Sequence, residues 1–334
     1  MRTEFQDLRI LLVGCGSIGQ RHARVLRLLG VKHLFACDPI HERLSSLMRQ
    51  NPGIDSCESL SEGLRRRPDA AFILTPPKLH VPMATEAVRA GCHVFVEKPI
   101  SDTLEGVDKL EALARERGKR VMIGLCFRFH EGILKAKELV DHGAIGRVIS
   151  IRALMGEHLP DVRPDFKNLF SSQYSGAFDL IHDLDLALWF AGQPVRSVKG
   201  LYGSYSDIGI RAPDLVEILI DFSDRCMANV HLDFFQRPRR RRTELIGTEG
   251  VVCVDFTKWD EYTVSVFRQG AGGWQSDTQG TARDDMFIAE DKAFLLSLLN
   301  GTDPGCGIKE ACKSLRVILA MQGGMIEGAQ GDRR

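Results

Sequence analysis

Four ionisable residues have the types and spacing that acid–base chemistry on a hydroxyl group requires. Asp179, His182 and Asp183 stand at i, i+3 and i+4, which predicts one helix face for all three. An imidazole can take a proton near neutral pH, and a neighbouring carboxylate can orient it. Lys98 follows a short apolar run, and its ammonium group can stabilise negative charge that develops on an oxygen. The alternatives are a structural histidine, a helix N-terminal charge partner and a solvated lysine.

A glycine-rich motif near the start of the chain predicts phosphate binding. Gly14, Gly16 and Gly19 form GxGxxG directly after an apolar run. Gly14 permits a tight turn, Gly16 lets a pyrophosphate approach the backbone, and Gly19 lets the next helix pack closely. Ser17 and Ile18 begin that helix, whose free N–H groups can bind the phosphates. The motif therefore indicates a dinucleotide site, with a structural glycine turn as the alternative.

Asp38 stands about 20 residues beyond the glycine motif, where a ribose-binding carboxylate belongs. A carboxylate accepts a hydrogen bond from the ribose of NAD and repels the 2′-phosphate of NADP, so Asp38 favours NAD. Asp38 can also be a helix N-cap, because Pro39 follows it. Arg43 lies one turn further on and can accommodate a phosphate, which leaves NADP open.

Residues 1–125 alternate short apolar runs with helical stretches. Such runs are typical of parallel strands buried on both faces. The alternation predicts a doubly wound parallel sheet, a Rossmann domain for NAD(P). Ser59 with Glu62 and Asp102 with Glu105 resemble capping boxes. The predicted strands are Ile10–Val13, Phe35–Cys37, Ala70–Leu74, Val94–Val96 and Val121–Ile123, and the predicted helices are Ser17–Leu29, Pro39–Gln50, Ser59–Arg67, Leu79–Ala90 and Asp102–Glu116.

Residues 126–334 contain more strands than helices and predict an α+β domain on a large, mostly antiparallel sheet. This domain would bind substrate and form oligomers, and its last helices can pack back on the first domain. The polar stretch Gly156–Gly176 is a substrate loop or a surface excursion. The predicted helices are Gly132–Asp141, Ala177–Ala191, Asp285–Asn300 and Ile308–Ile326, and the predicted strands are Val148–Leu154, Val195–Gly200, Val216–Phe222, Ala228–Phe235, Thr243–Ile246, Val251–Phe256 and Tyr262–Phe267.

Composition excludes several classes of protein. The chain has 334 residues, with 44 Lys plus Arg and 44 Asp plus Glu, so no net charge favours nucleic acid or a membrane surface. No apolar run approaches the roughly 20 residues of a membrane span, and the polar first residues predict no signal peptide. The nine cysteines are scattered without a CxxC pair, which indicates reduced thiols and a cytoplasmic protein.

Further motifs resemble the Gfo/Idh/MocA family of NAD(P)-dependent sugar oxidoreductases. Thr75–His80 reads TPPKLH and Glu97–Pro99 reads EKP, and each follows a predicted strand. Residues 124–130 resemble the family segment after the next strand, 176–186 its catalytic helix, and 247–250 a turn in its C-terminal sheet. The ordered set covers nearly the whole chain.

The resemblance implies a Rossmann domain joined to an α+β domain, and a homodimer or homotetramer formed through the open sheet face. It implies that Thr75, Pro76 and His80 line the cofactor. It places Glu97 and Lys98 in the cofactor site as well, with Lys98 touching both the nicotinamide ribose and the substrate. A cis peptide bond often precedes the proline of the EKP motif in this family.

One departure from the family pattern concerns Asp179. Many members have an aspartate four residues before the histidine, whereas Asp179 is three before His182, so His182 carries over better. Arg128 can contact a substrate carboxylate or phosphate, or form a salt bridge. The basic run Arg237 and Arg239–Arg242 lies between predicted strands, where ion pairs or sugar-nucleotide phosphates are favoured over nucleic acid.

The sequence thus predicts an oxidoreductase that transfers a hydride between a nicotinamide cofactor and a carbinol or carbonyl of a sugar, polyol, sugar acid or nucleotide sugar. Lys98, His182 and Asp179 would be catalytic, and the same three with Arg128 would bind a substrate held between the domains. No metal is expected, and the partner is a small sugar-type molecule. The alternatives are an NAD-dependent glycoside hydrolase with transient redox and a non-catalytic cofactor-binding sensor or scaffold.

Overall fold

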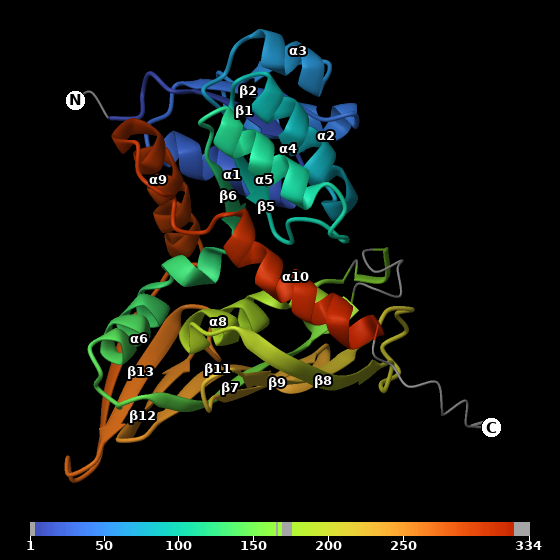
Figure 1. Ribbon diagram of the computed structural model, residues 1–334. Coiled ribbons are helices and arrows are strands. Elements are labelled where there is room, and N and C mark those ends of the chain that lie inside the picture. Colours follow the sequence, from blue (N-terminus) through green and yellow to red (C-terminus); the bar gives the residue numbers. More distant parts are fainter. Residues whose placement is uncertain (1–3, 165, 169–175, 324–334) are drawn as a thin grey trace. The chain divides into compact units, whose positions relative to one another are not determined.

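The computed structural model describes residues 4–164, 166–168 and 176–323 (Figure 1). The chain forms two compact units. The first contains Met1–Leu134 and Thr281–Leu315, and the second contains Lys135–Gly280 and Arg316–Arg334. The chain therefore leaves the first unit and returns to it. Among the described residues, no helix combines the length and apolarity needed to cross a membrane.

The first unit contains a six-stranded parallel sheet in the order β3-β2-β1-β4-β5-β6. The order reverses between β1 and β4, and open α/β sheets bind ligands at the carboxyl ends of strands at such a point. This topology confirms the predicted Rossmann sheet. The strands are β1 Arg9–Val13, β2 His33–Cys37, β3 Asp55–Ser56, β4 Ala70–Ile73, β5 His93–Glu97 and β6 Val121–Gly124.

Five helices connect these strands, and a sixth comes from the returning segment. That sixth helix, α9 (Asp285–Asn300), packs against α1 and the short 3₁₀ helix η2. The connecting helices are α1 Ser17–Leu28, α2 His41–Gln50, α3 Leu60–Arg65, α4 His80–Arg89 and α5 Val107–Glu116. The 3₁₀ helix η1 Pro77–Leu79 precedes α4, η2 Cys126–Phe129 follows β6, and α10 spans Ile308–Gly323.

One of the two predicted capping boxes is formed in part, because the Glu62 carboxylate accepts from the Glu58 N–H rather than from that of Ser59. The Ser59 hydroxyl accepts a hydrogen bond from the Glu62 N–H, 3.2 Å away, at the start of α3. The prediction for Asp102 and Glu105 is wrong, because α5 begins only at Val107. Gly106 precedes that helix with φ 75°, a left-handed conformation that favours glycine, so the chain turns there before the helix can start.

The second unit contains an eight-stranded sheet in the order β14-β13-β12-β11-β7-β10-β9-β8. All neighbours are antiparallel except β7 and β10, which confirms the predicted mostly antiparallel sheet. Helix α8 packs on β7, β10 and β11. The elements are α6 Glu131–Asp141, β7 Val148–His158, α7 Leu159–Val162, η3 Phe166–Asn168, η4 Gly176–Asp179, α8 Ile181–Ala191, β8 Val195–Gly203, β9 Leu215–Phe222, β10 Met227–Asp233, β11 Phe235–Gly247, β12 Gly250–Asp255, β13 Glu261–Arg268 and β14 Trp274–Gly280.

Two polar segments differ from the predicted strands. The basic run was expected between strands, but it lies inside β11, where Arg241, Thr243 and Leu245 are buried. The buried side chains alternate with exposed ones at the period of a strand, and a paired arginine takes an apolar position. The edge strand β14 is polar and largely exposed, so backbone pairing with β13 defines it rather than apolar alternation.

The predicted helix Ala177–Ala191 is divided into η4 and α8, with Leu180 between them. The Ala177 N–H donates to the carbonyl oxygen of Pro213 at 2.8 Å, and this contact fixes η4 outside the helix. A Cβ atom at Gly176 would lie 2.2 Å from that same oxygen. The expectation that Asp179 shares a helix face with His182 and Asp183 is therefore wrong.

Candidate functional site

The glycine motif forms a tight turn between β1 and α1. A Cβ atom at Gly14 would lie 2.6 Å from the Leu74 carbonyl oxygen, and one at Gly19 would lie 2.1 Å from the Gly14 carbonyl oxygen. Gly14 also has φ 102°. Gly16 is different, because a Cβ atom there would meet nothing within 4 Å. Gly14 and Gly19 are thus needed for packing, while Gly16 leaves the outer side of the turn open.

The start of α1 suits an anion. Gly16 is the N-cap of this helix, and no side chain of the described residues accepts a hydrogen bond from the N–H groups at its start. The first turn, which contains Ser17 and Ile18, has no acidic residue. Backbone N–H groups at a helix start lack intrahelical partners, and the helix dipole favours negative charge there. Together with the open side of Gly16, this arrangement fits the pyrophosphate of a dinucleotide.

Asp38 lies beside the same turn. One oxygen of its carboxylate accepts from the Cys15 N–H at 2.7 Å, and the other accepts from the Ile40 N–H at 2.8 Å. Ile40 is the N-cap of α2, so the alternative N-cap assignment of Asp38 is wrong. Each carboxylate oxygen can accept more than one hydrogen bond, so the fixed carboxylate can also bind a ribose hydroxyl. Arg43 is exposed on α2.

His80 connects the loops that follow β4 and β5. Its Nδ1 lies 2.8 Å from the Pro99 carbonyl oxygen, and its Nε2 lies 2.6 Å from the Thr75 carbonyl oxygen. The side chain is buried, which lowers its pKa, while the two carbonyls act in the opposite direction. Pro76 precedes η1 in the first loop, and the Lys98–Pro99 peptide bond is cis, as the family resemblance implies. His80 thus has the contacts of a residue that positions both loops.

Arg128 is buried in η2, with 4% of its surface exposed. Its guanidinium group lies 3.9 Å from the Glu310 carboxylate of α10. A salt bridge that shapes the cleft between the domains was one of the two roles that the sequence left open, and the pair described here lies within the first unit. Among the described residues, no group of three or more His, Cys, Asp or Glu side chains is placed to hold a metal ion.

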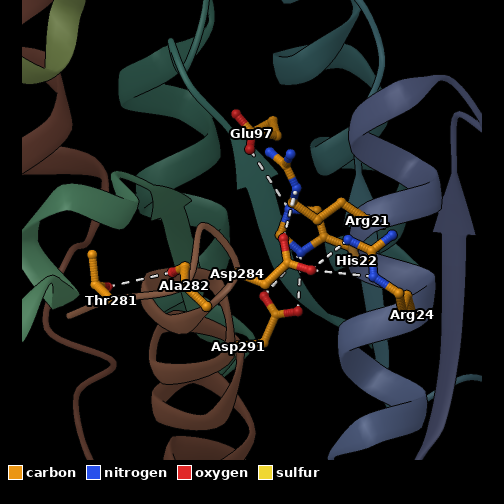
Figure 2. Close-up of polar contacts among 8 residues, drawn as sticks. All are labelled: Arg21, His22, Arg24, Glu97, Thr281, Ala282, Asp284 and Asp291. Carbon is orange, nitrogen blue, oxygen red and sulfur yellow. Dashed lines mark hydrogen bonds and ion pairs between the residues drawn. The ribbon is translucent and has the colours of Figure 1, made fainter. Parts of the chain in front are cut away.

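A buried ionic cluster behind β5 was not predicted from the sequence. Figure 2 shows His22 of α1 between Asp291 of α9 and Glu97 of β5. The His22 Nδ1 atom lies 2.9 Å and 3.0 Å from the two Asp291 oxygens, and Nε2 lies 3.6 Å from a Glu97 oxygen. His22 follows the glycine motif closely, but Asp291 stands between Glu290 and Lys292 in α9, so the local sequence gives no sign that this aspartate is buried.

The cluster predicts a pH-dependent stability. Burial lowers the pKa of His22, but the charges and hydrogen bonds of Asp291 and Glu97 outweigh burial and raise it to about 10. The ordinary value is 6.5, so this stabilisation is complete below pH 6.5 and is lost as the pH rises through 10. We expect the unfolding free energy to fall by up to about 1.4 kcal/mol per pH unit between pH 7 and 9 from this group alone.

Urea unfolding at several pH values measures this effect. The comparison is with His22→Gln combined with Asp291→Asn, which removes both charges together. The wild type should have the steeper pH dependence, and equal slopes in the two proteins would contradict the assignment.

In the second unit, His182 and Asp183 lie in the first turn of α8, and their side chains have different surroundings. His182 is partly exposed, whereas Asp183 is fully buried. The Asp183 carboxylate accepts from Arg241 of β11 at 3.1 Å and 2.8 Å, in a two-point ion pair. Burial raises the pKa of Asp183 and Arg241 opposes that shift. Asp183 therefore anchors the helix that carries His182 to the sheet.

Other arginines of β11 are also paired within the second unit. Arg237 donates to Asp161 at 2.8 Å and 3.0 Å. Arg239 lies 3.5 Å from Glu157 and stacks 3.8 Å over the Trp259 ring. These ion pairs offset much of the positive charge of the basic run, and they argue against a nucleic-acid surface.

The stretch Gly156–Gly176 contributes to a pocket of about 550 Å³ in the second unit. Residues 165 and 169–175 of this stretch lie outside the described residues. Lys167 and Arg237 bring cationic groups to the pocket, and Phe166 and Phe235 bring rings. The other lining residues are His158, Pro160, Ser206, Asp207 and Ile208.

Comparison with known proteins agrees with this fold. Residues 8–125 match the family model "Oxidoreductase family, NAD-binding Rossmann fold", and residues 133–253 match "GFO/IDH/MocA C-terminal domain". The chain is 28% identical over 308 residues to myo-inositol 2-dehydrogenase of Thermotoga maritima, covering 89% of this chain and 90% of the relative. It is 26% identical over 303 residues to UDP-N-acetylglucosamine 3-dehydrogenase of Acidithiobacillus ferrooxidans, covering 86% and 88%.

A solved structure shows the same fold. Scyllo-inositol dehydrogenase of Lactobacillus casei, with bound NAD(H) and scyllo-inositol, superposes with a TM-score of 0.81 at 24% identity. The superposition covers 95% of this chain and 96% of that one. The two family models together span most of the chain, and the first of them covers the glycine turn, the start of α1 and Asp38. The chain belongs to the Gfo/Idh/MocA family of oxidoreductases and carries its NAD-binding Rossmann domain.

Proposed function

We propose that this protein is an NAD-dependent dehydrogenase that oxidises a ring carbinol of a polyol, sugar or nucleotide sugar to a ketone, or reduces the ketone. The main support is the position of Lys98, which directly follows β5, one strand from the topological switch point. The relatives named above act on inositols and on a UDP-sugar. Bound NAD supplies the hydride acceptor.

Three side chains divide the proton chemistry in this proposal. The Lys98 ammonium group donates a hydrogen bond to the carbinol oxygen and stabilises the negative charge that develops on it. The His182 imidazole takes the hydroxyl proton while the hydride leaves the carbon, and returns it in the reverse reaction. Asp179 orients His182 and favours its protonated form. Arg128 and the pocket beside Gly156–Gly176 are proposed to bind other parts of the substrate.

A substrate panel tests the proposed reaction. Myo-inositol, scyllo-inositol and UDP-N-acetylglucosamine would each be incubated with the protein and NAD, and reduced nicotinamide followed by absorbance. We expect turnover of at least one member of this panel or of a related ring polyol. Cofactor binding without reduction by any polyol or sugar would contradict the proposal and favour a sensor.

We further propose that Asp38 excludes NADP. The isosteric change Asp38→Asn removes the charge and keeps an oxygen for one of the two N–H donors, those of Cys15 and Ile40. It should raise the NADPH-to-NADH affinity ratio by roughly 10-fold, because a 2′-phosphate no longer faces a carboxylate. Thermal unfolding with each cofactor measures this ratio. A wild-type protein that prefers NADPH would contradict the role of Asp38 and point to Arg43.

We propose that the outer face of the second sheet joins copies of this chain in a homodimer or homotetramer. Leu219 of β9, Met227 of β10 and Leu201 of β8 are 46%, 54% and 71% exposed. The alternate positions on β9, such as Ile218, are fully buried against the other face. Three large apolar side chains on one open sheet are typical of an interface.

Light scattering tests this assembly. The combined change Leu219→Glu and Met227→Lys should convert the oligomer into monomers, while Leu28→Glu, an exposed leucine of α1, should not. A wild-type monomer, or an oligomer unchanged by the pair of substitutions, would contradict this interface.

A cytoplasmic location is proposed from the cysteines. All nine are buried, and none is in a disulfide bond. Burial raises the pKa of Cys15 and of Cys37 to about 12, so both stay protonated thiols. Unpaired cysteines throughout a chain are typical of a reducing compartment.

A further inference from the structure

The backbone of Lys98 is hydrogen-bonded to the side chain of the preceding residue, Glu97. One Glu97 oxygen accepts a hydrogen bond from the Lys98 N–H at 2.8 Å. The other Glu97 oxygen faces His22 Nε2 at 3.6 Å. Glu97 is 8% exposed, so its carboxylate has little access to water. A buried carboxylate needs a charged partner, and His22 is placed to be that partner.

The surroundings of His22 suit a cation. The rings of Phe95, Phe72 and Phe287 lie 5.1 Å, 5.6 Å and 5.9 Å from the imidazole. The titratable groups that face it are Glu97 from β5, and Asp291 and Glu290 from α9. Burial raises the pKa of both Glu290 and Asp291. Of the two, Asp291 is the one whose carboxylate hydrogen-bonds His22, which opposes that rise, so Asp291 supplies the main countercharge.

The three contacts form one chain from α9 to the lysine. Asp291 binds His22 through both carboxylate oxygens, and His22 faces Glu97 (Figure 2). Glu97 in turn accepts from the Lys98 backbone N–H. All of these residues belong to the first unit, although 269 positions separate His22 from Asp291. We propose that Glu97 is a positioning residue for Lys98, and that Asp291 of α9 acts on Glu97 through His22. We call Asp291, His22 and Glu97 the relay.

This inference rests on the proposed role of Lys98 in catalysis. It adds that the segment returning after the second unit controls the geometry of the lysine turn. None of the three relay residues contacts the reacting atoms in this account. Their effect comes from fixing the Lys98 backbone, since small displacements of a reacting group cost large factors in rate.

Asp291→Asn is the decisive variant. It keeps the shape and one oxygen for the imidazole but removes the charge that keeps His22 protonated. At pH 8 we expect a neutral His22, exchange of the Lys98 amide hydrogen at least 10-fold faster than in the wild type, and a kcat lowered by roughly 10- to 100-fold. At pH 6, where His22 regains its proton, all three values should return toward those of the wild type.

Three measurements report these changes separately. Nuclear magnetic resonance of ¹⁵N-labelled histidine reads the charge of His22, mass spectrometry reads exchange at Lys98, and kcat comes from the substrate found with the panel. Asp284→Asn is the matched control, because Asp284 pairs Arg21 and Arg24 at the surface of the same α1–α9 contact. This control should leave all three measurements unchanged.

The outcomes separate the relay from the proposed reaction. A neutral His22 at pH 8 with unchanged Lys98 exchange and unchanged kcat would overturn the relay. An equal loss of kcat at both pH values would also overturn it, since that result indicates only structural damage. If Asp291→Asn fails to fold, Glu97→Gln should give the same faster exchange and lower kcat without recovery at pH 6. Full activity of Lys98→Met would instead overturn the proposed reaction, while exchange at residue 98 still reports on the relay.

Discussion

Replacing Lys98 by methionine should lower kcat by about 10²- to 10³-fold and leave the affinity for NAD nearly unchanged. Methionine keeps much of the length of the side chain but has no charge to hold the carbinol oxygen. His182→Ala should lower kcat by about 10²- to 10⁴-fold, because the proton then has no acceptor. Added imidazole should restore part of the activity of His182→Ala and none of that of Lys98→Met.

Steady-state kinetics with the substrate found in the panel measure these effects. Lys109→Met, at an exposed position of α5, is the control and should behave as the wild type. Near-normal kcat in both Lys98→Met and His182→Ala would show that other residues perform the chemistry.

Arg241→Met should destabilise the protein by about 3–5 kcal/mol. Asp183 is fully buried, and each of its two carboxylate oxygens accepts a hydrogen bond from Arg241. Removing Arg241 takes away the main group that opposes the effect of burial on Asp183, so the carboxylate takes up a proton more readily. The loss of stability should therefore become smaller as the pH falls.

Urea unfolding measures this loss, with Arg242→Met as the control. Arg242 is exposed on the same strand, and its replacement should change the unfolding free energy by less than about 0.5 kcal/mol. Adding Asp183→Leu to Arg241→Met should recover much of the lost stability, since no buried charge then remains unpaired. Equal effects of Arg241→Met and Arg242→Met would contradict the assigned ion pair.

The parallel sheet of the first unit could be predicted because its strands are buried on both faces. Every residue of β4 is buried, and the apolar run that predicts it is continuous. The glycine turn was equally predictable, because Gly14 and Gly19 are fixed by backbone contacts that no other residue allows. Local signals of this kind need no knowledge of the rest of the fold.

Other features depend on contacts between distant segments. The bond from Ala177 to Pro213 interrupts a sequence that is helical in its local pattern. Arginine usually lies at the surface, so the basic run around Arg241 did not predict a half-buried strand. Its pairing with Asp183, which lies 58 residues away in the sequence, explains why Arg241 is buried. The polar strand β14 is defined by its pairing with β13.

The candidate site divides in the same way. The residues proposed to bind NAD and substrate stand in short motifs that can be recognised locally, as GxGxxG, TPPKLH and EKP show. The contacts from Asp291 through His22 and Glu97 to Lys98 could not be predicted, because Asp291 lies in α9, 269 positions after His22 in the sequence. Only a packed core shows that Asp291 and His22 meet.

The most direct test of the proposed reaction follows the hydrogen itself. The substrate found in the panel would carry deuterium on the carbinol carbon, and the reduced cofactor would be examined by mass spectrometry. We predict one deuterium in NADH per turnover, and the same ratio at a much lower rate in His182→Ala. Product formed without net NADH, or NADH formed without deuterium, would contradict direct hydride transfer, and the first result would favour a hydrolase with a transient redox cycle.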